Sequence, residues 1–278
     1  MNTSLYISSG ALHAYQQKLD TSANNLANIN TPGFKRREQS FSEILASQLN
    51  NQVRGDQEQG RLTPMGLRVG YGTVAGMTQL DMAQGQAIET GSPFDLMLAG
   101  KGFFQVRTGD GEVRYTRDGN FHLSPNPNNS GSYHLAHANG ALLLDQTGNP
   151  IELSGADEVK ITENGQIQLR NKQTGQTSLS QQQVGVVDIP NPSLLQNTGD
   201  NQFVIDEAAL PQGSAVGDYV RAMEAGEFKV STGFLEGSNV DITKEMADLM
   251  TSQRSYQMNS RAVSYADQMM GIANNIMR

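Results

Sequence analysis

The two ends of the chain carry apolar residues at heptad spacing. In residues 2–30 one series steps by seven, and a second series of small or apolar residues follows three positions later. The first is Leu5, Leu12, Leu19 and Leu26, and the second is Ser8, Tyr15, Ser22 and Ile29. This a/d spacing predicts a helix that packs lengthwise against other helices. We expect it to end at Asn30-Thr31-Pro32-Gly33, a type II turn in which Gly33 takes a left-handed backbone.

Residues 240–278 repeat the pattern. The series of sevens is Ile242, Leu249, Tyr256, Val263, Met270 and Met277, and small residues including Ala266 and Ala273 lie three positions on. Asn239 or Asp241 is a candidate N-cap. Six of the twelve methionines lie at position 246 or beyond, and flexible thioethers suit contacts with several slightly different neighbours. A second helix is therefore predicted.

The polar face of the first helix is nearly uncharged. Up to residue 31 there is one Lys (Lys18), one Asp (Asp20) and no Glu, whereas Asn occurs five times. Neighbouring helices can cover such a face without burying charges. Both helices have poor intrinsic propensity, so we expect an antiparallel pair that is loose in the monomer and orders on assembly. The predicted assembly interface is Leu5, Leu12, Leu19, Leu26, Ile29, Ile242, Leu249, Tyr256, Val263 and Met270.

The central residues have β-type sequence. Hairpin turns are predicted at Asp110-Gly111, Asp118-Gly119, Asn139-Gly140 and Asn164-Gly165. Strands are expected at 103–106, 113–116, 159–162, 167–169, 184–189, 202–206, 219–223 and 227–231. Strands without intervening helices indicate an antiparallel barrel or sandwich.

These elements predict a mixed α and β fold, with an antiparallel β-rich central domain and terminal helices that pair as a coiled-coil-like bundle. We expect residues 1–33 and 236–278 to form the helical assembly domain and residues 91–235 the β domain. Residues 34–90 are expected to hold a short helix at 40–50 and then an extended connector rich in Gln and Gly.

Composition narrows the functional classes. Hydrophobic residues make up 37% and charged residues 17% of the 278-residue chain, which fits one modest core. A net charge of −8 argues against nucleic acid as a partner. The absence of cysteine excludes disulfides, zinc–thiolate sites, iron–sulfur clusters and cysteine nucleophiles. We find neither a cleavable secretory signal nor a membrane-spanning stretch, so an exported chain would be secreted uncleaved by a dedicated machine.

The sequence offers only weak candidates for metal-binding or catalytic residues. His122, His134 and His137 could suggest a metal site, but His134 and His137 are expected on opposite sides of a strand, and a solvated surface is the favoured interpretation. The residues Asp110, Asp118 and Asp145 lie in or beside turns, where Asp serves the backbone rather than catalysis. The basic run Lys35-Arg36-Arg37 is expected to be a solvated corner, or alternatively to meet acidic patches on a neighbour. No catalytic residue, metal or cofactor is predicted, and the Gly-rich residues 66–72 lack the Gly-Lys-Ser/Thr of a phosphate loop.

Three motifs carry a resemblance to a known family. Residues 23–36 read ANNLANINTPGFKR, residues 100–106 read GKGFFQV followed by YTRDGNF at 115–121, and residues 233–241 read GFLEGSNVD. The third continues through QRSY at 253–256 and Asn259-Ser260. In this order they resemble the signatures of flagellar rod and hook proteins. The length and residues 67–72 (LRVGYG) are most similar to the distal-rod subunits.

The resemblance implies an axial subunit of the flagellar basal body, exported uncleaved through the flagellar type III apparatus. Its end helices would line a tube and its β domain would lie outside. Implied partners are other copies, neighbouring rod and hook subunits, and ring proteins or the cell wall. Residues 124–130 and Tyr133-His134-Leu135 depart from the family pattern and predict a surface loop particular to this chain. Two alternatives remain: a hook-region or junction protein, and a secreted oligomeric module with a β binding domain.

Overall fold

The computed structural model describes residues 2–43, 46–49, 67–70, 72–127, 129, 131–154, 157–171, 177–206, 210–211, 216–224 and 226–276. The chain forms two compact units. The helical unit consists of residues 1–26, 37–79 and 241–278, and the β unit consists of residues 27–36 and 80–240. The backbone therefore passes from one unit to the other four times, after residues 26, 36, 79 and 240.

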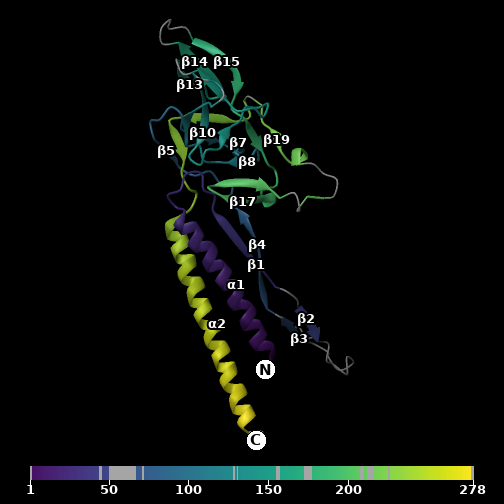
Figure 1. Cartoon of the computed structure of the whole chain (residues 1–278). Coiled ribbons are helices and arrows are strands. Elements are labelled where there is room, and N and C mark those ends of the chain that lie inside the picture. The colour runs from purple at the N-terminus through teal and green to yellow at the C-terminus, as the bar shows by residue number, and fades with distance from the viewer. Residues whose placement is uncertain are drawn as a thin grey trace, which may run out of the picture. The chain divides into compact units, whose positions relative to one another are not determined.

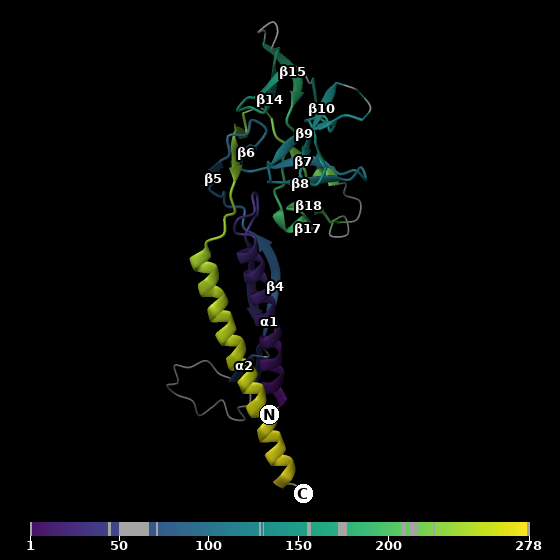
Figure 2. The same ribbon diagram turned by 60° about the vertical axis from the view of Figure 1, so that its left-hand side comes forward.

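The helical unit contains the two predicted helices, α1 (Asn2–Ala27) and α2 (Ile242–Ile276). They run side by side in both views (Figures 1 and 2). Asp241 is the N-cap of α2, since its Oδ1 accepts from the backbone N–H of Thr243 at 2.8 Å and of Lys244 at 3.3 Å. Asn239, the other candidate, bonds within the β unit instead.

Strands occupy the segment where a short helix was expected at 40–50. β1 (Arg37–Glu43) pairs with β4 (Thr73–Leu80), and β2 (Ala46–Leu49) pairs antiparallel with β3 (Leu67–Gly70). The helix prediction was wrong because the partners of β1 and β2 lie far along the chain, beyond any local pattern. The expected connector falls partly on residues 50–66, which lie outside the described residues.

Contacts with α1 hold β1 in place. The Asn25 side chain donates Nδ2–H to the Arg37 carbonyl at 2.9 Å, and its Oδ1 accepts the Arg37 N–H at 2.9 Å. Asn25 is buried, so its amide satisfies both backbone groups of Arg37 at the start of β1. Further along, the Phe41 ring lies 5.7 Å from the Tyr15 ring and 5.4 Å from Lys18 Nζ.

The β unit is built on a ten-stranded sheet. Its main path runs β12-β10-β11-β7-β8-β18-β17, with β9 on β10 and with β16 joining β7 to β19. The strands are β7 (Phe103–Arg107), β8 (Val113–Thr116), β9 (Phe121–Pro125), β10 (Ser132–His137), β11 (Leu142–Leu143), β12 (Glu152–Ser154), β16 (Val186–Asp188), β17 (Leu195–Gly199), β18 (Gln202–Ile205) and β19 (Arg221–Ala222).

Three smaller sheets complete the β unit. One joins β13 (Asp157–Ile161), β14 (Gln166–Asn171) and β15 (Thr177–Gln183). The other two pair β6 (Leu96–Ala99) with β20 (Lys229–Thr232) and β5 (Ala87–Glu89) with β21 (Phe234–Glu236). Short 3-10 turns lie at Pro192–Leu194 and Val216–Asp218. The registers within the β unit are antiparallel, so the predicted antiparallel β-rich centre between two terminal helices is confirmed.

Apolar residues form two clusters on the two faces of β7. Phe104 and Val106 belong to the larger cluster, with Leu96, Leu135 and Leu143. The second cluster contains Phe103, Tyr115, Val187, Ile189, Phe203 and Ile205. Adjacent residues of a strand point to opposite faces, so Phe103 and Phe104 anchor one cluster each.

Three of the four predicted hairpin turns are confirmed. Gly111, Gly140 and Gly165 have φ of 86°, 85° and 76°, and they lie between the paired strands β7–β8, β10–β11 and β13–β14. This is the left-handed backbone for which an Asn-Gly or Asp-Gly turn selects.

The prediction at Asp118-Gly119 was wrong. β8 pairs with β7 and β18, whereas β9 pairs with β10, so no hairpin forms here. Gly119 instead allows a close approach: a Cβ on it would lie 1.6 Å from the Leu96 carbonyl oxygen, and its own carbonyl accepts the Leu96 N–H at 3.0 Å.

Candidate functional site

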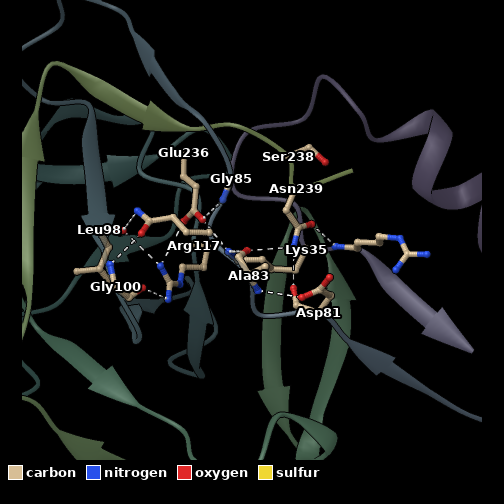
Figure 3. Close-up of polar contacts among 12 residues, drawn as sticks. Lys35, Asp81, Ala83, Gly85, Leu98, Gly100, Arg117, Glu236, Ser238 and Asn239 are labelled. Atoms are coloured by element: carbon tan, nitrogen blue, oxygen red, sulfur yellow. Dashed lines mark hydrogen bonds and ion pairs between the residues drawn. The ribbon is translucent and has the colours of Figure 1, made fainter. Parts of the chain in front are cut away.

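Three charged side chains from distant parts of the sequence meet inside the β unit (Figure 3). Lys35 Nζ lies 2.6 Å from Glu236 Oε1, and Arg117 Nη1 lies 3.2 Å from Glu236 Oε2. All three side chains are about 1% exposed. We refer to Lys35, Arg117 and Glu236 as the ion triad.

Backbone groups complete the coordination of the ion triad. Lys35 Nζ also donates to the Ala83 carbonyl at 2.9 Å, and Glu236 Oε1 accepts the Gly85 N–H at 3.0 Å. Arg117 Nη2 donates to the Gly100 carbonyl at 2.7 Å, and its Nη1 lies 3.4 Å from the Leu98 carbonyl. The guanidinium also lies 5.5 Å from the centre of the Phe103 ring. Buried charges of this kind are tolerated only with such partners.

Burial dominates the electrostatics of both cations. It lowers the pKa of Lys35 and of Arg117 below their ordinary values, although the charge and hydrogen bonds of Glu236 act in the opposite direction. The charge of Arg117 also lowers the pKa of Lys35, by less than burial does. Asp81 adds favourable charge near Lys35, and Asp188 does so near Arg117.

Asn239 ties together the backbone segments around the ion triad. Its Oδ1 accepts the Arg36 N–H at 2.7 Å, and its Nδ2 donates to the carbonyls of Asp81 at 2.8 Å and Ala83 at 3.0 Å. The Arg36 carbonyl in turn accepts the Asp81 N–H at 2.8 Å. Arg36, Asp81 and Asn239 are thus bonded to one another within the β unit. They lie close to three of the four points at which the chain passes between the units, after residues 36, 79 and 240.

The turn within the first motif contacts Glu236 through the backbone. Gly33 donates its N–H to the Glu236 carbonyl at 2.7 Å. It has φ of 69°, and Phe34 donates to the Thr31 carbonyl at 3.3 Å, so the predicted turn and the left-handed Gly33 are confirmed. A Cβ on Gly33 would lie 2.4 Å from the Asp118 nitrogen, so only glycine fits.

Comparisons with known proteins match the same segments. Models for the flagella basal body rod protein, the flagellar hook protein FlgE/F/G D1 domain and the flagellar basal body rod FlgEFG protein C-terminal cover residues 5–35, 97–169 and 231–276. The flagellar basal-body rod protein FlgG of Agrobacterium fabrum is 32% identical over 97% of both chains. The chain belongs to the flagellar basal-body rod protein family.

Two Bacillus subtilis proteins are also similar over the full length of this rod-family chain. The flagellar hook-basal body complex protein FlhP is 33% identical, covering 99% of this chain and 100% of the relative. The flagellar basal-body rod protein FlgG is 29% identical and covers 100% of both. Each of the three matched regions supplies one member of the ion triad: Lys35, Arg117 and Glu236.

The sequence patterns of this rod-family protein do not predict the ion triad. Lys35 and Arg36 are buried, at 2% and 8% exposure, so the prediction of a solvated basic corner was wrong. The alternative was that this basic run meets acidic patches on a neighbouring subunit. Lys35 instead pairs with Glu236 of the same chain. Lys35 and Glu236 are 201 positions apart, and no local pattern links them. The available signal was a charged residue inside each of the three motifs.

Most predicted assembly residues are half-buried. This holds for Leu5, Leu12, Leu19, Leu26, Ile29, Leu249, Tyr256, Val263 and Met270, whereas Ile242 is 49% exposed. Pro32 is half-buried and Gly33 is buried in the turn. On α2 the fully buried residues are Glu245 and Ser252.

The histidines differ from the expectation of a solvated surface. His122 is exposed, but His134 and His137 are buried. Both lie in β10, whose residues are buried on both faces near its end. His134 Nδ1 lies 3.2 Å from the Ile151 carbonyl. The described residues contain no group of three or more potential metal ligands of the His, Cys, Asp or Glu type.

His137 pairs with Asp118, which lies in the second motif between β8 and β9. Its Nε2 lies 3.1 Å from Asp118 Oδ2, and its Nδ1 lies 3.0 Å from Asn139 Oδ1. Burial pushes the pKa of His137 down, but the hydrogen bond and charge of Asp118, with Asn139 and Asp200, together raise it above 6.5. These residues line an open recess of about 430 Å³ together with Thr31, Ala138 and Asn201.

The three candidate carboxylates lie in connecting segments, and two of them accept backbone hydrogen bonds. Asp110 is exposed in the β7–β8 turn. Asp145 Oδ1 accepts the N–H groups of Thr147 at 2.9 Å and Asn149 at 2.8 Å, and Asp118 Oδ1 accepts that of Asn120 at 3.0 Å. The predicted turn role is confirmed for Asp118 and Asp145.

The segment at 124–130 extends the β9–β10 hairpin as far as it is described. β9 runs to Pro125, and the buried Asn126 donates its N–H to the Ser132 carbonyl at 3.0 Å and its Nδ2–H to Glu152 Oε1 at 3.2 Å. Asn128 and Ser130 lie outside the described residues.

Proposed function

We propose that this protein is a structural axial subunit of the flagellar rod, of the distal-rod type, that assembles through its two terminal helices. The observation that carries this is the similarity to rod proteins along the whole chain, with one buried ion triad joining all three motif regions. The function is mechanical, and we propose no catalytic role or cofactor.

The interface proposed for assembly is the heptad stripe of each helix. On α1 it is Leu5, Leu12, Leu19, Leu26 and Ile29, and on α2 it is Ile242, Leu249, Tyr256, Val263 and Met270. Their partial burial in the single chain supports this, because part of each side chain is left for a neighbour. We propose coiled-coil-like pairing of α1 with α2 and with the helices of other copies.

The domain division expected from the sequence is retained as part of the proposal. Residues 1–33 and 236–278 would assemble, residues 34–90 would connect, and residues 91–235 would make lateral contacts that stiffen the tube. The ion triad supports this division of labour because it fixes residues 33–36 and 236–239 to one another inside the β unit.

The proposed partners are other copies of this chain and neighbouring rod and hook subunits. We further propose export through the flagellar type III apparatus and contact with ring proteins or the cell wall, at the basal body outside the cytoplasmic membrane. Neither helix in the described part of the chain has the length and apolar character needed to cross a bilayer.

A clean deletion, with electron microscopy of purified basal bodies, tests the proposal. We expect a rod that stops short and carries no hook. A complete rod lacking only a hook would favour the hook-region or junction alternative. Intact hooks and filaments would overturn the axial role. A binding module would then be distinguished by its closed, countable oligomers, because axial subunits with heterologous contacts form open-ended assemblies.

A further inference from the structure

The methionines in the described part of the chain range from exposed to buried. On α2, Met246, Met250, Met258 and Met269 are between 49% and 62% exposed. In the β unit, Met97 and Met223 are only 9% and 6% exposed. Thioether oxidation depends on access of the oxidant to sulfur, so the exposed set is chemically vulnerable and the buried set is shielded.

Two of the exposed methionines belong to a second apolar stripe on α2. Along the C-terminal half of the helix, exposed apolar residues recur at alternating steps of four and three. They are Met258, Ala262, Tyr265, Met269, Ile272 and Ile276. This stripe lies roughly a third of a turn around the helix from the series containing Val263 and Met270. Its spacing is that of a surface that receives another helix.

We propose that Met258 and Met269 form an oxidation-sensitive site, at which conversion to methionine sulfoxide prevents α2 from receiving a helix of a second copy. The oxidant class is a peroxide. The sulfur lone pair attacks one peroxide oxygen, the O–O bond breaks, and an S=O group and water are formed from hydrogen peroxide. Sulfur loses two electrons and the peroxide gains them, so no further reductant or cofactor takes part.

The consequence follows from the polarity of the product. A sulfoxide replaces a flexible apolar group with a strongly dipolar one, and burying it without a hydrogen-bond partner is unfavourable. The stripe around it offers Ala262, Tyr265, Ile272 and Ile276, of which only the Tyr265 hydroxyl can donate. The inference rests on the proposed function, because a second copy is taken as the occupant of the stripe.

The proposal has a chemical half, the selective oxidation of Met258 and Met269, and an assembly half, the loss of helix binding that follows. The chemical half is tested by mapping sulfoxides on the full-length monomer. The protein is treated with graded hydrogen peroxide and then digested for peptide mass spectrometry. Met258 and Met269 should oxidise about tenfold or more faster than Met97 and Met223, which are reached only by local or global opening. Equal rates for the two pairs would overturn the proposal.

The assembly half is tested on the same material by sedimentation and electron microscopy. Oxidised protein should retain its circular dichroism but lose most of its assembly, and methionine sulfoxide reductases should restore it. The M258L/M269L double variant keeps an apolar, helix-favouring side chain at both positions. It should therefore assemble after a peroxide dose at which the sulfoxide map shows Met270 of the heptad stripe still unoxidised. As a control, M77L removes a methionine that is 80% exposed in β4, and it should give no protection.

The outcomes separate this inference from the proposed function. Undiminished assembly of fully oxidised protein would overturn the inference and leave the proposed function intact. Loss of assembly that M258L/M269L does not prevent would also overturn it. If untreated protein never assembles, the proposed function and the assembly half fail together, whereas the sulfoxide map still decides the chemical half.

Discussion

At the scale of single residues, the stability of the β unit depends on a few specific residues. Glu236 bonds directly to both cations of the ion triad. Gly33 occupies a position in which both its φ and its lack of a side chain are required. His137 is the protonatable partner of Asp118. Each predicts a measurable consequence for stability.

Replacing Glu236 by Gln leaves Lys35 and Arg117 buried beside a neutral amide. We expect the free energy of unfolding of the full chain to fall by about 3–5 kcal/mol, the usual loss when one member of a buried pair is removed. Urea denaturation measures this. The exposed pair of Arg221 and Glu227 provides the control, and Glu227→Gln should cost at most about 1 kcal/mol. Equal effects of the two variants would contradict the role of the ion triad.

Gly33→Ala and Gly91→Ala form a matched pair. Their φ values are 69° and 72°, but a Cβ on Gly91 meets nothing within 4 Å, whereas one on Gly33 meets the Asp118 backbone at 2.4 Å. Gly91→Ala should cost about 1–2 kcal/mol from the left-handed backbone alone. Gly33→Ala should cost more than about 4 kcal/mol, since the backbone at Asp118 must move. Similar melting temperatures for the two variants would show that the contact is unimportant.

His137 predicts a pH dependence of stability. Its pKa is raised in the folded protein, so its contribution is complete below the unfolded pKa of about 6.5 and is lost as pH rises through the folded pKa. The free energy of unfolding should therefore fall across this range in the wild type and less steeply in His137→Gln. His122→Gln, at an exposed position, should keep the wild-type slope. An unchanged slope in His137→Gln would contradict this assignment.

At the scale of elements, the sequence predicted those helices and hairpins whose signals lie close together along the chain. Heptads predicted α1 and α2, and Gly-containing pairs predicted three hairpins, because these signals lie within a few residues of each other. β1 was missed because Arg37 is held by Asn25 and its strand partner begins at Thr73. The ion triad was missed for the same reason, since tertiary contacts bring its members together.

The heptad stripe of α2, which contains Leu249, predicts how a substitution affects assembly. Leu249→Asp places a charge at a half-buried position of the proposed interface, so copies should no longer associate while the β unit stays folded. Gln257→Asp adds the same charge at an exposed position of the same helix and should assemble normally. Sedimentation velocity and motility of a complemented strain measure the two variants. A motile Leu249→Asp strain would remove the stripe from the interface.

At the scale of the whole molecule, the two units differ in how their stability arises. The β unit has two apolar clusters and the buried ion triad. The helical unit has few fully buried side chains, among them Ala11, Ala14, Glu245 and Ser252. Stability of the helices should therefore depend more on neighbours than on the chain itself.

Amide hydrogen exchange tests this difference. In a verified monomer, strands β7 and β8 should exchange far more slowly than α1 and the C-terminal half of α2, and the helices should gain protection on assembly. The matched control is the same monomer after the Leu249→Asp change, which should show no gain. Helices as protected as β7 in the monomer would contradict the expectation that they order on assembly.

The separation of Lys35 from Glu236 also bears on protein quality control. A nascent or truncated chain that stops before residue 236 contains most of the strand sequence but lacks the carboxylate that pairs directly with Lys35 and Arg117. Such a chain stays less stable than the finished one and remains open to proteases for longer. The two buried cations gain their shared carboxylate only once residue 236 has been synthesised, so the β unit reaches its full stability late in translation.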